Sequence, residues 1–402
     1  MPYRPSPEEL DEFLTRGVAE VIVSTEVRAL LAAGERALRV KQGFDPTSRN
    51  LHLGHAVGLR KLRTLAKWGH DIVLIVGDWT TQIGDPTDKD TTRPMRSREE
   101  VMANAQTYLD QFHLIVPREN TRIRFQDEWF GKFGLRDIIE LASRFSVQQL
   151  LAREEFRNRL DRKTAIPIKD LLYPLLQAHD SVAIEADIEF GGTDQLFNIL
   201  AGRELQEDLG QPPQQVFIVH LLEGLDGNKM SKSIPHTAIW LTDPAAEMYG
   251  KVMSISDALM PHYFEWGTEM PLGEVREILA ALGSGGLHPR DAKERLARQI
   301  VTELHSAEAA AGAAEAFRKR FREGERPADA IELSFAPSPD PAVERVLVHL
   351  GIAKSLGEAR RWVSQSGVRI DDVKVSPGVQ VAMNGETFIQ IGPRRSWRIT
   401  WT

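Results

Sequence analysis

The chain has 402 residues, more than a single hydrophobic core usually serves, so two or three domains are expected. Hydrophobic residues make up 42% and charged residues 27%, as is typical of globular proteins, and the absence of cysteine excludes a disulfide framework and any thiolate zinc site. The net charge is −7, but residues 341–402 carry nine Lys and Arg against five Asp and Glu, which leaves −11 on the rest. A basic end suggests contact with a polyanion, although charge alone is more typical of an ordinary solvated surface.

No contact with a membrane is expected. No apolar run reaches the roughly 18 residues of a membrane span, and the first residues, MPYRPSPEELDEFLTRG, are polar and lack the apolar core of a signal peptide. We therefore expect a cytoplasmic protein.

Strand-like runs alternate with helical patterns through residues 1–240. The runs ALRVKQGFD, DIVLIVGD, TRIRFQ and QVFIVHLL are predicted to be buried strands, and HAVGLRKLRTLAKWG has the apolar spacing of a helix. This alternation predicts an α/β domain in which helices cover both faces of a parallel sheet. Residues from about 128 to 170 are predicted to be a helical, charged insertion between the halves of the sheet.

Beyond residue 240 the pattern changes. Residues 241–322 are predicted to form a small helical domain, because strand-like runs stop and the stretch AEAAAGAAEAFRKRF has high helix propensity. Residues 323–340 are rich in Pro, Glu and Asp and are predicted to be a linker. Residues 341–402 are predicted to form a small α+β domain with two short helices and a hairpin.

The stretch FDPTSRNLHLGH places His52 and His55 three residues apart at the predicted start of a helix. A zinc site would need three or four protein ligands, and no acidic residue stands at suitable spacing nearby; a structural pair is the plain alternative. A helix N-terminus offers unpaired N–H groups and partial positive charge, Gly54 leaves room for a base or phosphate, and Thr47 adds a donor. The pair therefore fits a nucleotide phosphate better than a metal, and no metal ligand is assigned.

A second motif, KMSKS, places Lys229 and Lys232 in a loop after a predicted strand. Alone it is typical of a solvated loop. Together with HLGH it resembles the two signatures of class I aminoacyl-tRNA synthetases. This resemblance implies a doubly wound, Rossmann-like catalytic domain with ATP as a substrate.

The stretch YPLLQAHD contains Tyr173, Gln177 and Asp180, whose spacing of four and three places all three on one face of a helix. A carboxylate at the end of an apolar slot would accept a hydrogen bond from a phenolic hydroxyl, whereas phenylalanine would leave that carboxylate buried and unpaired. With GGTDQ at 191–195 and GDPTDKDTTR at 84–93, this stretch resembles tyrosyl-tRNA synthetases, and the resemblance covers essentially the whole chain.

The resemblance implies how the substrates are held. Asp180 is expected to accept from the hydroxyl of tyrosine, and the residues expected around the ammonium and carboxylate groups of tyrosine are Asp85, Tyr173, Gln177 and Gln195. The residues expected to bind the nucleoside part of ATP are Gly54, His55, Gly192 and Asp194, with Asp45 near both substrates. Seven residues are expected to be catalytic: His55 on the nucleoside side, and at the phosphates Thr47, His52, Lys89, Arg93, Lys229 and Lys232. Mg²⁺ is expected to arrive with ATP and to bridge its phosphates.

Two positions depart from the family pattern. Some members have a tyrosine where this chain has Lys41, and that tyrosine would share the substrate hydroxyl with the aspartate. His179 stands where many members have a tyrosine, and it is given no role.

The end of the chain resembles a small RNA-binding fold known from a ribosomal protein. The stretch SLGEARRWVSQSGVRIDDVKV carries this resemblance and is expected to turn as a hairpin at Asp371. Lys354, Arg360 and Arg361 are expected to contact RNA, because cationic side chains, arginine forks above all, suit phosphate groups. Trp397 offers a stacking face, but a tryptophan there is more typical of packing.

The resemblance implies a tyrosine–tRNA ligase that works on tRNA(Tyr), with residues 241–322 on the anticodon side and a homodimer formed through the inserted region. One alternative is a tryptophanyl-tRNA synthetase, which YPLLQAHD, GGTDQ and the C-terminal domain disfavour. The other is a non-catalytic RNA-binding relative, against which His52, His55 and KMSKS argue.

Overall fold

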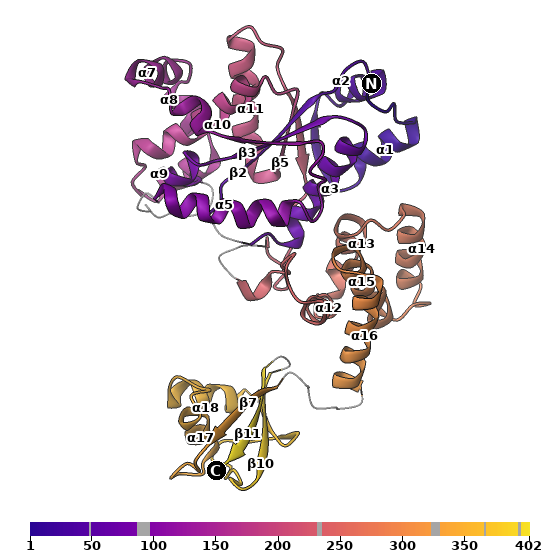
Figure 1. Cartoon of the computed structure of the whole chain (residues 1–402), viewed down its shortest axis with the longest axis vertical. Helices are drawn as coiled ribbons and strands as arrows, with labels where there is room; N and C mark the ends of the chain where they lie inside the picture. Colours follow the sequence, from indigo (N-terminus) through magenta and orange to yellow (C-terminus); the bar gives the residue numbers. More distant parts are fainter. Residues whose placement is uncertain (48–49, 87–96, 231–234, 323–329, 366, 393–394) are drawn as a thin grey trace. The chain divides into compact units, whose positions relative to one another are not determined.

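The computed structural model describes residues 1–47, 50–86, 97–230, 235–322, 330–365, 367–392 and 395–402 (Figure 1). Internal contacts divide the chain into two compact units, Met1–Ala314 and Glu315–Thr402. The predicted domain boundaries near residues 240 and 322 stay predictions. No helix in the described ranges is long and apolar enough to cross a membrane.

The first part of the first unit alternates strands and helices. Its strands are β1 (Val18–Ile22), β2 (Arg39–Phe44), β3 (Asp71–Val76), β4 (Thr121–Phe125), β5 (Ile188–Gly192) and β6 (Gln215–Val219). Its main helices are α1 (Pro7–Thr15), α2 (Ser24–Ala33), α3 (Leu53–Lys67), α4 (Thr80–Ile83), α5 (Arg98–Phe112), α10 (Ile168–Ile184) and α11 (Leu196–Asp208). The four predicted strands correspond to β2, β3, β4 and β6, and the helix predicted at HAVGLRKLRTLAKWG corresponds to α3, so these predictions are confirmed.

The six strands form one sheet in the order β1-β6-β5-β2-β3-β4. Only β1 is antiparallel to its neighbour; the other five strands are parallel. The chain runs outward from β2 to β4 and then restarts at β5 on the other side of β2, so the switch point of the doubly wound sheet lies between β2 and β5. Ligands bind outside the carboxyl ends of the strands at such a point.

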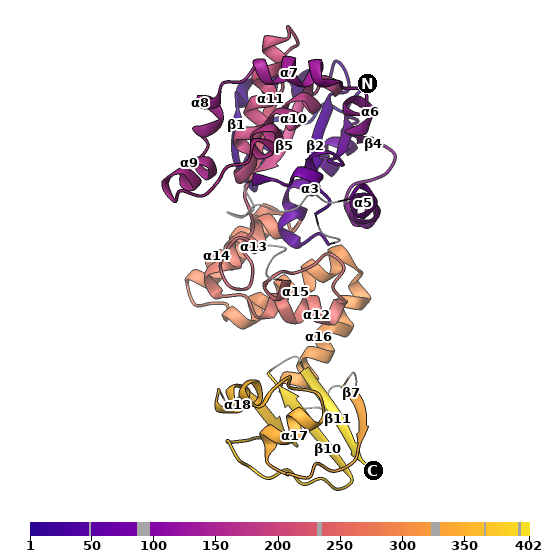
Figure 2. The ribbon, with the colours of Figure 1, turned by 90° about the vertical axis from the view of Figure 1, so that its left-hand side faces the viewer.

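Burial explains why these runs become central strands. All five residues of β6 and all but the first of β3 are buried, as expected for parallel strands covered on both faces. Helices α3 and α5 lie on one side of the sheet and α10 and α11 on the other (Figures 1 and 2). This packing holds β2 and β5 in place, and the switch point lies between their carboxyl ends.

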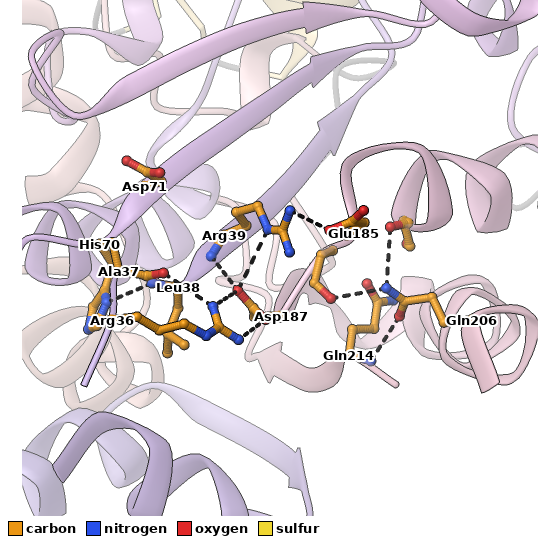
Figure 3. A network of polar contacts seen from close by, with 12 residues as sticks. Arg36, Ala37, Leu38, Arg39, His70, Asp71, Glu185, Asp187, Gln206 and Gln214 are labelled. Carbon is orange, nitrogen blue, oxygen red and sulfur yellow. Dashed lines mark hydrogen bonds and ion pairs between the residues drawn. The ribbon is translucent and has the colours of Figure 1, made fainter. Parts of the chain in front are cut away.

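A polar network holds the amino ends of β2 and β5 together (Figure 3). The Asp187 carboxylate accepts from the Arg36 guanidinium at 2.6 and 2.8 Å and from the backbone N–H of Arg39 at 2.7 Å. Gln206 of α11 accepts from the backbone N–H of Gln214 at 2.8 Å, just before β6. This network fixes the strands at their amino ends, on the side of the sheet opposite the cavity.

The inserted region is helical, as predicted. It contains α6 (Asp127–Phe130), α7 (Leu135–Ser143), α8 (Val147–Leu151) and α9 (Glu154–Asp161). The region from 241 to 322 is also helical, as predicted, with α12 (Ala245–Met253), α13 (Met260–Gly267), α14 (Leu272–Gly283), α15 (Pro289–Leu304) and α16 (Ala307–Arg322).

The second unit begins within α16 and continues as a small α+β fold. Its elements are β7 (Ile331–Phe335), α17 (Val343–His349), α18 (Leu356–Ser364), β8 (Val368–Ile370), β9 (Val373–Lys374), β10 (Glu386–Ile391) and β11 (Arg395–Trp401). The β8–β9 hairpin turns at Asp371 and Asp372, both with positive φ, as predicted. One prediction is wrong: residues 331–335 are not linker, because β7 pairs in parallel with β11 at the edge of the five-stranded sheet. The predicted fold class, a doubly wound α/β sheet followed by helices and a small α+β unit, is confirmed.

Candidate active site

A cavity of about 660 Å³ opens at the carboxyl ends of the parallel strands. It is lined from both halves of the sheet, as the switch point requires. The structure brings into it every described residue predicted to be catalytic or to bind tyrosine or ATP: Asp45, Thr47, His52, Gly54, His55, Asp85, Tyr173, Gln177, Asp180, Gly192, Asp194, Gln195 and Lys229. The predicted residues that lie outside the described ranges are Lys89, Arg93 and Lys232.

Asp180 lies in the cavity wall on α10 and is only 2% exposed. Its carboxylate accepts from Gln126 Nε2 at 2.8 Å and from Trp129 Nε1 at 3.1 Å. Burial raises the pKa of Asp180 to about 7, while the charge of Lys41 and these two hydrogen bonds oppose the rise. The site thus presents a fixed carboxyl group at the end of a buried slot, which suits a hydroxyl donor.

Gln126 is a lining residue that was not predicted. Its Oε1 accepts from the backbone N–H groups of Trp79 at 3.1 Å and Thr80 at 2.9 Å, and from the Thr80 hydroxyl at 3.1 Å. These contacts turn its Nε2 toward Asp180. Gln126 directly follows β4, and its place at the carboxyl end of a predicted strand was the available signal.

Acidic and amide groups also line the cavity. The Tyr173 hydroxyl donates to Asp45 Oδ2 at 3.1 Å, and burial raises the pKa of Tyr173 well above 10. Gln195 Nε2 donates to Asp85 Oδ2 at 2.9 Å. Two carboxylates with the Gln177 amide beside them suit an ammonium group.

The cavity also reaches the N-terminus of α3. His52 is the N-cap residue, and its backbone N–H donates to His55 Nδ1 at 3.2 Å while the two ring centroids lie 3.8 Å apart. A Cβ on Gly54 would lie 3.0 Å from His52 Nδ1, a tight contact, so the glycine leaves this ring its room. The helix start, two imidazoles and Thr47 suit phosphate oxygens.

Lys229 lies beside the nucleoside-binding residues. Its ammonium pairs with Asp194 Oδ2 at 2.5 Å, and its backbone bridges to Glu223. The Glu223 carbonyl in turn accepts from the Tyr263 hydroxyl of α13 at 2.7 Å. The start of the KMSKS loop is therefore tied to the helical region after the sheet.

The two departures from the family pattern are core residues. Lys41 does not line the cavity; it is fully buried and pairs with Glu189. The His179 ring packs on Phe130 and Phe133, and burial lowers the pKa of His179 to about 4.

The predicted RNA-binding residues lie on the second unit. Lys354, Arg360 and Arg361 are exposed at or next to α18. Trp397 is only 8% exposed and belongs to the core of this unit. The interpretation that it is a packing residue is therefore confirmed, and it offers no face on which a base could stack. The guanidinium of Arg395 instead covers the Trp362 ring, 4.6 Å from the centroid.

Two family models match the chain. The model described as "tRNA synthetases class I (W and Y)" matches residues 33–322, and an S4 domain model matches residues 343–386. A tyrosine–tRNA ligase of Dehalococcoides mccartyi is 47% identical over 388 residues, which cover 96% of this chain and 97% of that protein. A tyrosine–tRNA ligase of Geobacter sulfurreducens is 43% identical and covers 96% of this chain and 98% of that protein.

Solved structures share the fold. Tyrosyl-tRNA synthetase from Aeropyrum pernix superimposes with a TM-score of 0.61 at 23% identity and covers 79% of this chain and 99% of that chain. Tryptophanyl-tRNA synthetase from Plasmodium falciparum superimposes with a TM-score of 0.59 at 13% identity and covers 77% and 89%. The structures do not separate the two specificities, whereas the curated relatives do not favour the tryptophanyl alternative. The chain therefore belongs to the tyrosyl-tRNA synthetase family of class I aminoacyl-tRNA synthetases.

Proposed function

We propose that this chain activates tyrosine with ATP and transfers the tyrosyl group to tRNA(Tyr). One observation carries the proposal: a single cavity joins the buried carboxyl group of Asp180 to the N-terminus of α3 with its two histidines. The first feature suits a phenol and the second suits a triphosphate, so both substrates fit one site.

Asp180 selects tyrosine in this proposal. The substrate hydroxyl donates to its ionised carboxylate, which Gln126 and Trp129 already hold in place. Phenylalanine would leave the carboxylate without this donor, at a cost of about 1–3 kcal/mol or more. The groups assigned to the other end of tyrosine are Asp85, Tyr173, Gln177 and Gln195.

The activation step needs no protein nucleophile. The tyrosine carboxylate attacks the α-phosphate of ATP, and pyrophosphate leaves as tyrosyl-adenylate forms. The protein aligns the reactants and stabilises charge on the phosphates. The groups assigned to the phosphates are Thr47, His52, Lys89, Arg93, Lys229 and Lys232; those assigned to the nucleoside side are Gly54, His55, Gly192 and Asp194, with Asp45 between the substrates.

Mg²⁺ belongs to this proposal as part of MgATP, where it would neutralise phosphate charge. Among the residues that the structure describes, no group of three or more His, Asp or Glu side chains could hold a metal ion. No protein cage for the ion is therefore assigned.

In the second step the terminal ribose hydroxyl of tRNA takes the tyrosyl group and AMP leaves. We assign tRNA contact on the second unit to Lys354, Arg360 and Arg361, whose exposure next to and on α18 supports this role. The helices from 241 to 322 are assigned to the anticodon side of the tRNA. The cytoplasm, where tRNA is charged, is the proposed location.

A homodimer through the inserted region completes the proposal. Leu135 and Ile139 stand one turn apart on α7 and are 76% and 61% exposed, and Val147 on α8 is 56% exposed. Neighbouring exposed apolar side chains of this size favour an interface with another protein surface.

The test is ATP–pyrophosphate exchange with the full-length protein and each amino acid in turn. The proposal expects exchange with tyrosine and, after addition of tRNA(Tyr), tyrosyl-tRNA. Exchange with tryptophan alone would identify the tryptophanyl alternative, and no exchange with any amino acid would identify a non-catalytic relative. Either result would overturn the proposal.

A further inference from the structure

A buried ion pair borders the cavity and has been given no role so far. Lys41 on β2 is 0% exposed, and its ammonium lies 3.0 Å from Glu189 Oε1 on β5. The same ammonium donates to the Gln177 carbonyl at 2.9 Å and to the Ser181 hydroxyl at 2.7 Å, both on α10. One lysine therefore joins three elements that meet at the switch point.

The carboxylate of the pair is equally constrained. Glu189 accepts from Gln214 Nε2 at 2.6 Å, from the Ser181 hydroxyl at 3.1 Å and from Gln177 Nε2 at 3.4 Å. Gln214 is the residue whose backbone N–H binds Gln206 in Figure 3. The pair is thus anchored to the polar network on the amino side of the sheet, and Glu189 itself lines the cavity.

The contacts of Lys41 bracket the tyrosine-binding face of α10. Gln177 and Ser181 lie one helical turn apart, and Asp180 lies between them. A change in the Lys41 contacts would shift the turn that carries both Gln177 and Asp180. Because Lys41 does not line the cavity, any effect it has on the bound substrates must pass through this turn of α10.

Lys41 is also a source of positive charge for Asp180. The charged groups that act on this carboxyl group are Lys41 from β2, which favours ionisation, and Glu189 from β5, which opposes it less strongly. The inserted helix α6 contributes the neutral donor Trp129, and Gln126 just before it contributes a second. On α10 itself, the pKa of His179 is about 4, so this neighbour is neutral at working pH.

We propose that Lys41 is a positioning residue for recognition of the tyrosine hydroxyl: it clamps α10 to β5 and keeps the Asp180 carboxyl group aligned. This inference rests on the proposed function. A family tyrosine at this position would contact the substrate directly, whereas in this chain the lysine acts through Gln177, Glu189 and Asp180.

The test uses two variants of the full-length protein. Lys41→Met removes the ammonium but leaves Glu189 as a buried, unpaired carboxylate, which destabilises the fold. Lys41→Met/Glu189→Gln removes both charges, so it keeps the test valid if the single variant fails to fold. The matched control is Lys61→Met, because Lys61 is also a buried lysine that donates to a backbone carbonyl, that of Phe13, and it does not line the cavity.

ATP–pyrophosphate exchange is measured against tyrosine, ATP and pH. In both Lys41 variants we expect the KM for tyrosine to rise on the order of tenfold or more while the KM for ATP changes less than about twofold. In the double variant the acid limb of kcat/KM for tyrosine moves to higher pH, because the lost charge of Lys41, which favours ionisation of Asp180, outweighs the lost charge of Glu189, which opposes it. The control keeps the wild-type KM for tyrosine and the wild-type acid limb.

Unchanged tyrosine kinetics in the double variant would overturn the inference. An equal rise in both KM values with no shift of the acid limb would also overturn it, because that pattern indicates a general structural defect. A wild-type protein that shows no exchange with tyrosine would overturn the proposed function itself, and this result is read before the variants are compared.

Discussion

At the scale of single residues, Asp180 makes the use of tyrosine depend on pH. Burial raises the pKa of this carboxyl group to about 7, and its ionised form is a much stronger acceptor for the substrate hydroxyl than its protonated form, which carries a donor of its own. We therefore expect kcat/KM for tyrosine to fall about tenfold per pH unit below about pH 7 and to level off above it. The measurement is a pH profile of exchange. A profile that stays level well below pH 7 would contradict this role of Asp180.

The same carboxylate determines selectivity. Asp180→Asn places an amide, with a donor of its own, where the phenol must donate. We expect the preference for tyrosine over phenylalanine, measured as the ratio of kcat/KM values in exchange, to fall at least about tenfold. The acid limb near pH 7 should disappear in this variant. An unchanged ratio would show that another group selects the hydroxyl.

The helical face that binds tyrosine was predictable from sequence. Tyr173, Gln177 and Asp180 stand at i, i+4 and i+7, and this spacing fixes their common face whatever the rest of the fold does. Such local periodicity needs no knowledge of tertiary contacts.

The partners of that face were not predictable in the same way. Gln126 and Glu189 each lie at or beside a strand end, and their contacts depend on which strands become neighbours. Lys41 was noticed as a departure, but its buried pairing with Glu189 depends on β2 lying next to β5. The order of strands in a sheet is a property of the whole fold.

At the scale of elements, the start of α3 is the proposed phosphate site. A Cβ on Gly54 would lie 3.0 and 3.1 Å from two atoms of the His52 ring, so Gly54→Ala pushes this ring aside by a few tenths of an ångström. We expect kcat/KM for ATP in the exchange reaction to fall on the order of ten- to a hundredfold, because small misplacements of aligned groups are costly.

The control for this variant is Gly250→Ala on α12, where a Cβ meets no atom within 4 Å. This substitution should leave the kinetics unchanged and slightly stabilise the helix. Equal activities of the Gly54 and Gly250 variants would contradict the assignment of the start of α3 to the phosphate site.

The sequence predicted central strands better than the edge strand of the second unit. β3 and β6 are continuous apolar runs because helices cover both faces of their sheet. β7 has no buried residue, carries polar side chains and lies within a Pro- and Glu-rich stretch, so it has the composition of a linker. Its parallel pairing with β11, far along the chain, gives it its structure.

At the scale of the whole molecule, the second unit is proposed to bind tRNA by charge. Arg360→Ala/Arg361→Ala should weaken tRNA binding and lower the dependence of log affinity on log salt by about 0.7–0.9 for each phosphate group that the variant no longer neutralises. The Kd for tRNA is measured at several salt concentrations, with tyrosine-dependent exchange as the control. Exchange should be unchanged, because these residues lie outside the unit that holds the cavity. Unchanged binding of tRNA at every salt concentration would contradict the assignment.

The proposed homodimer depends on the exposed apolar surface of α7. Ile139→Asp adds a charge at a side chain that is 61% exposed, so it should weaken a dimer with little effect on the folding of one subunit. Molar mass in solution by light scattering is the measurement, and Val373→Asp, at a similarly exposed valine of the second unit, is the control. A wild-type protein that is monomeric, or an Ile139→Asp protein that stays dimeric, would contradict the proposed interface.

The central claim is that one cavity holds the phenol at Asp180 and the phosphates at the start of α3. A crystal structure of the protein with a non-hydrolysable analogue of tyrosyl-adenylate tests it most directly. We predict that the phenolic oxygen lies within hydrogen-bonding distance of the Asp180 carboxylate and that the phosphate-mimicking group faces His52 and Gly54. An aromatic ring bound away from Asp180, or a nucleotide bound away from the start of α3, would contradict the claim.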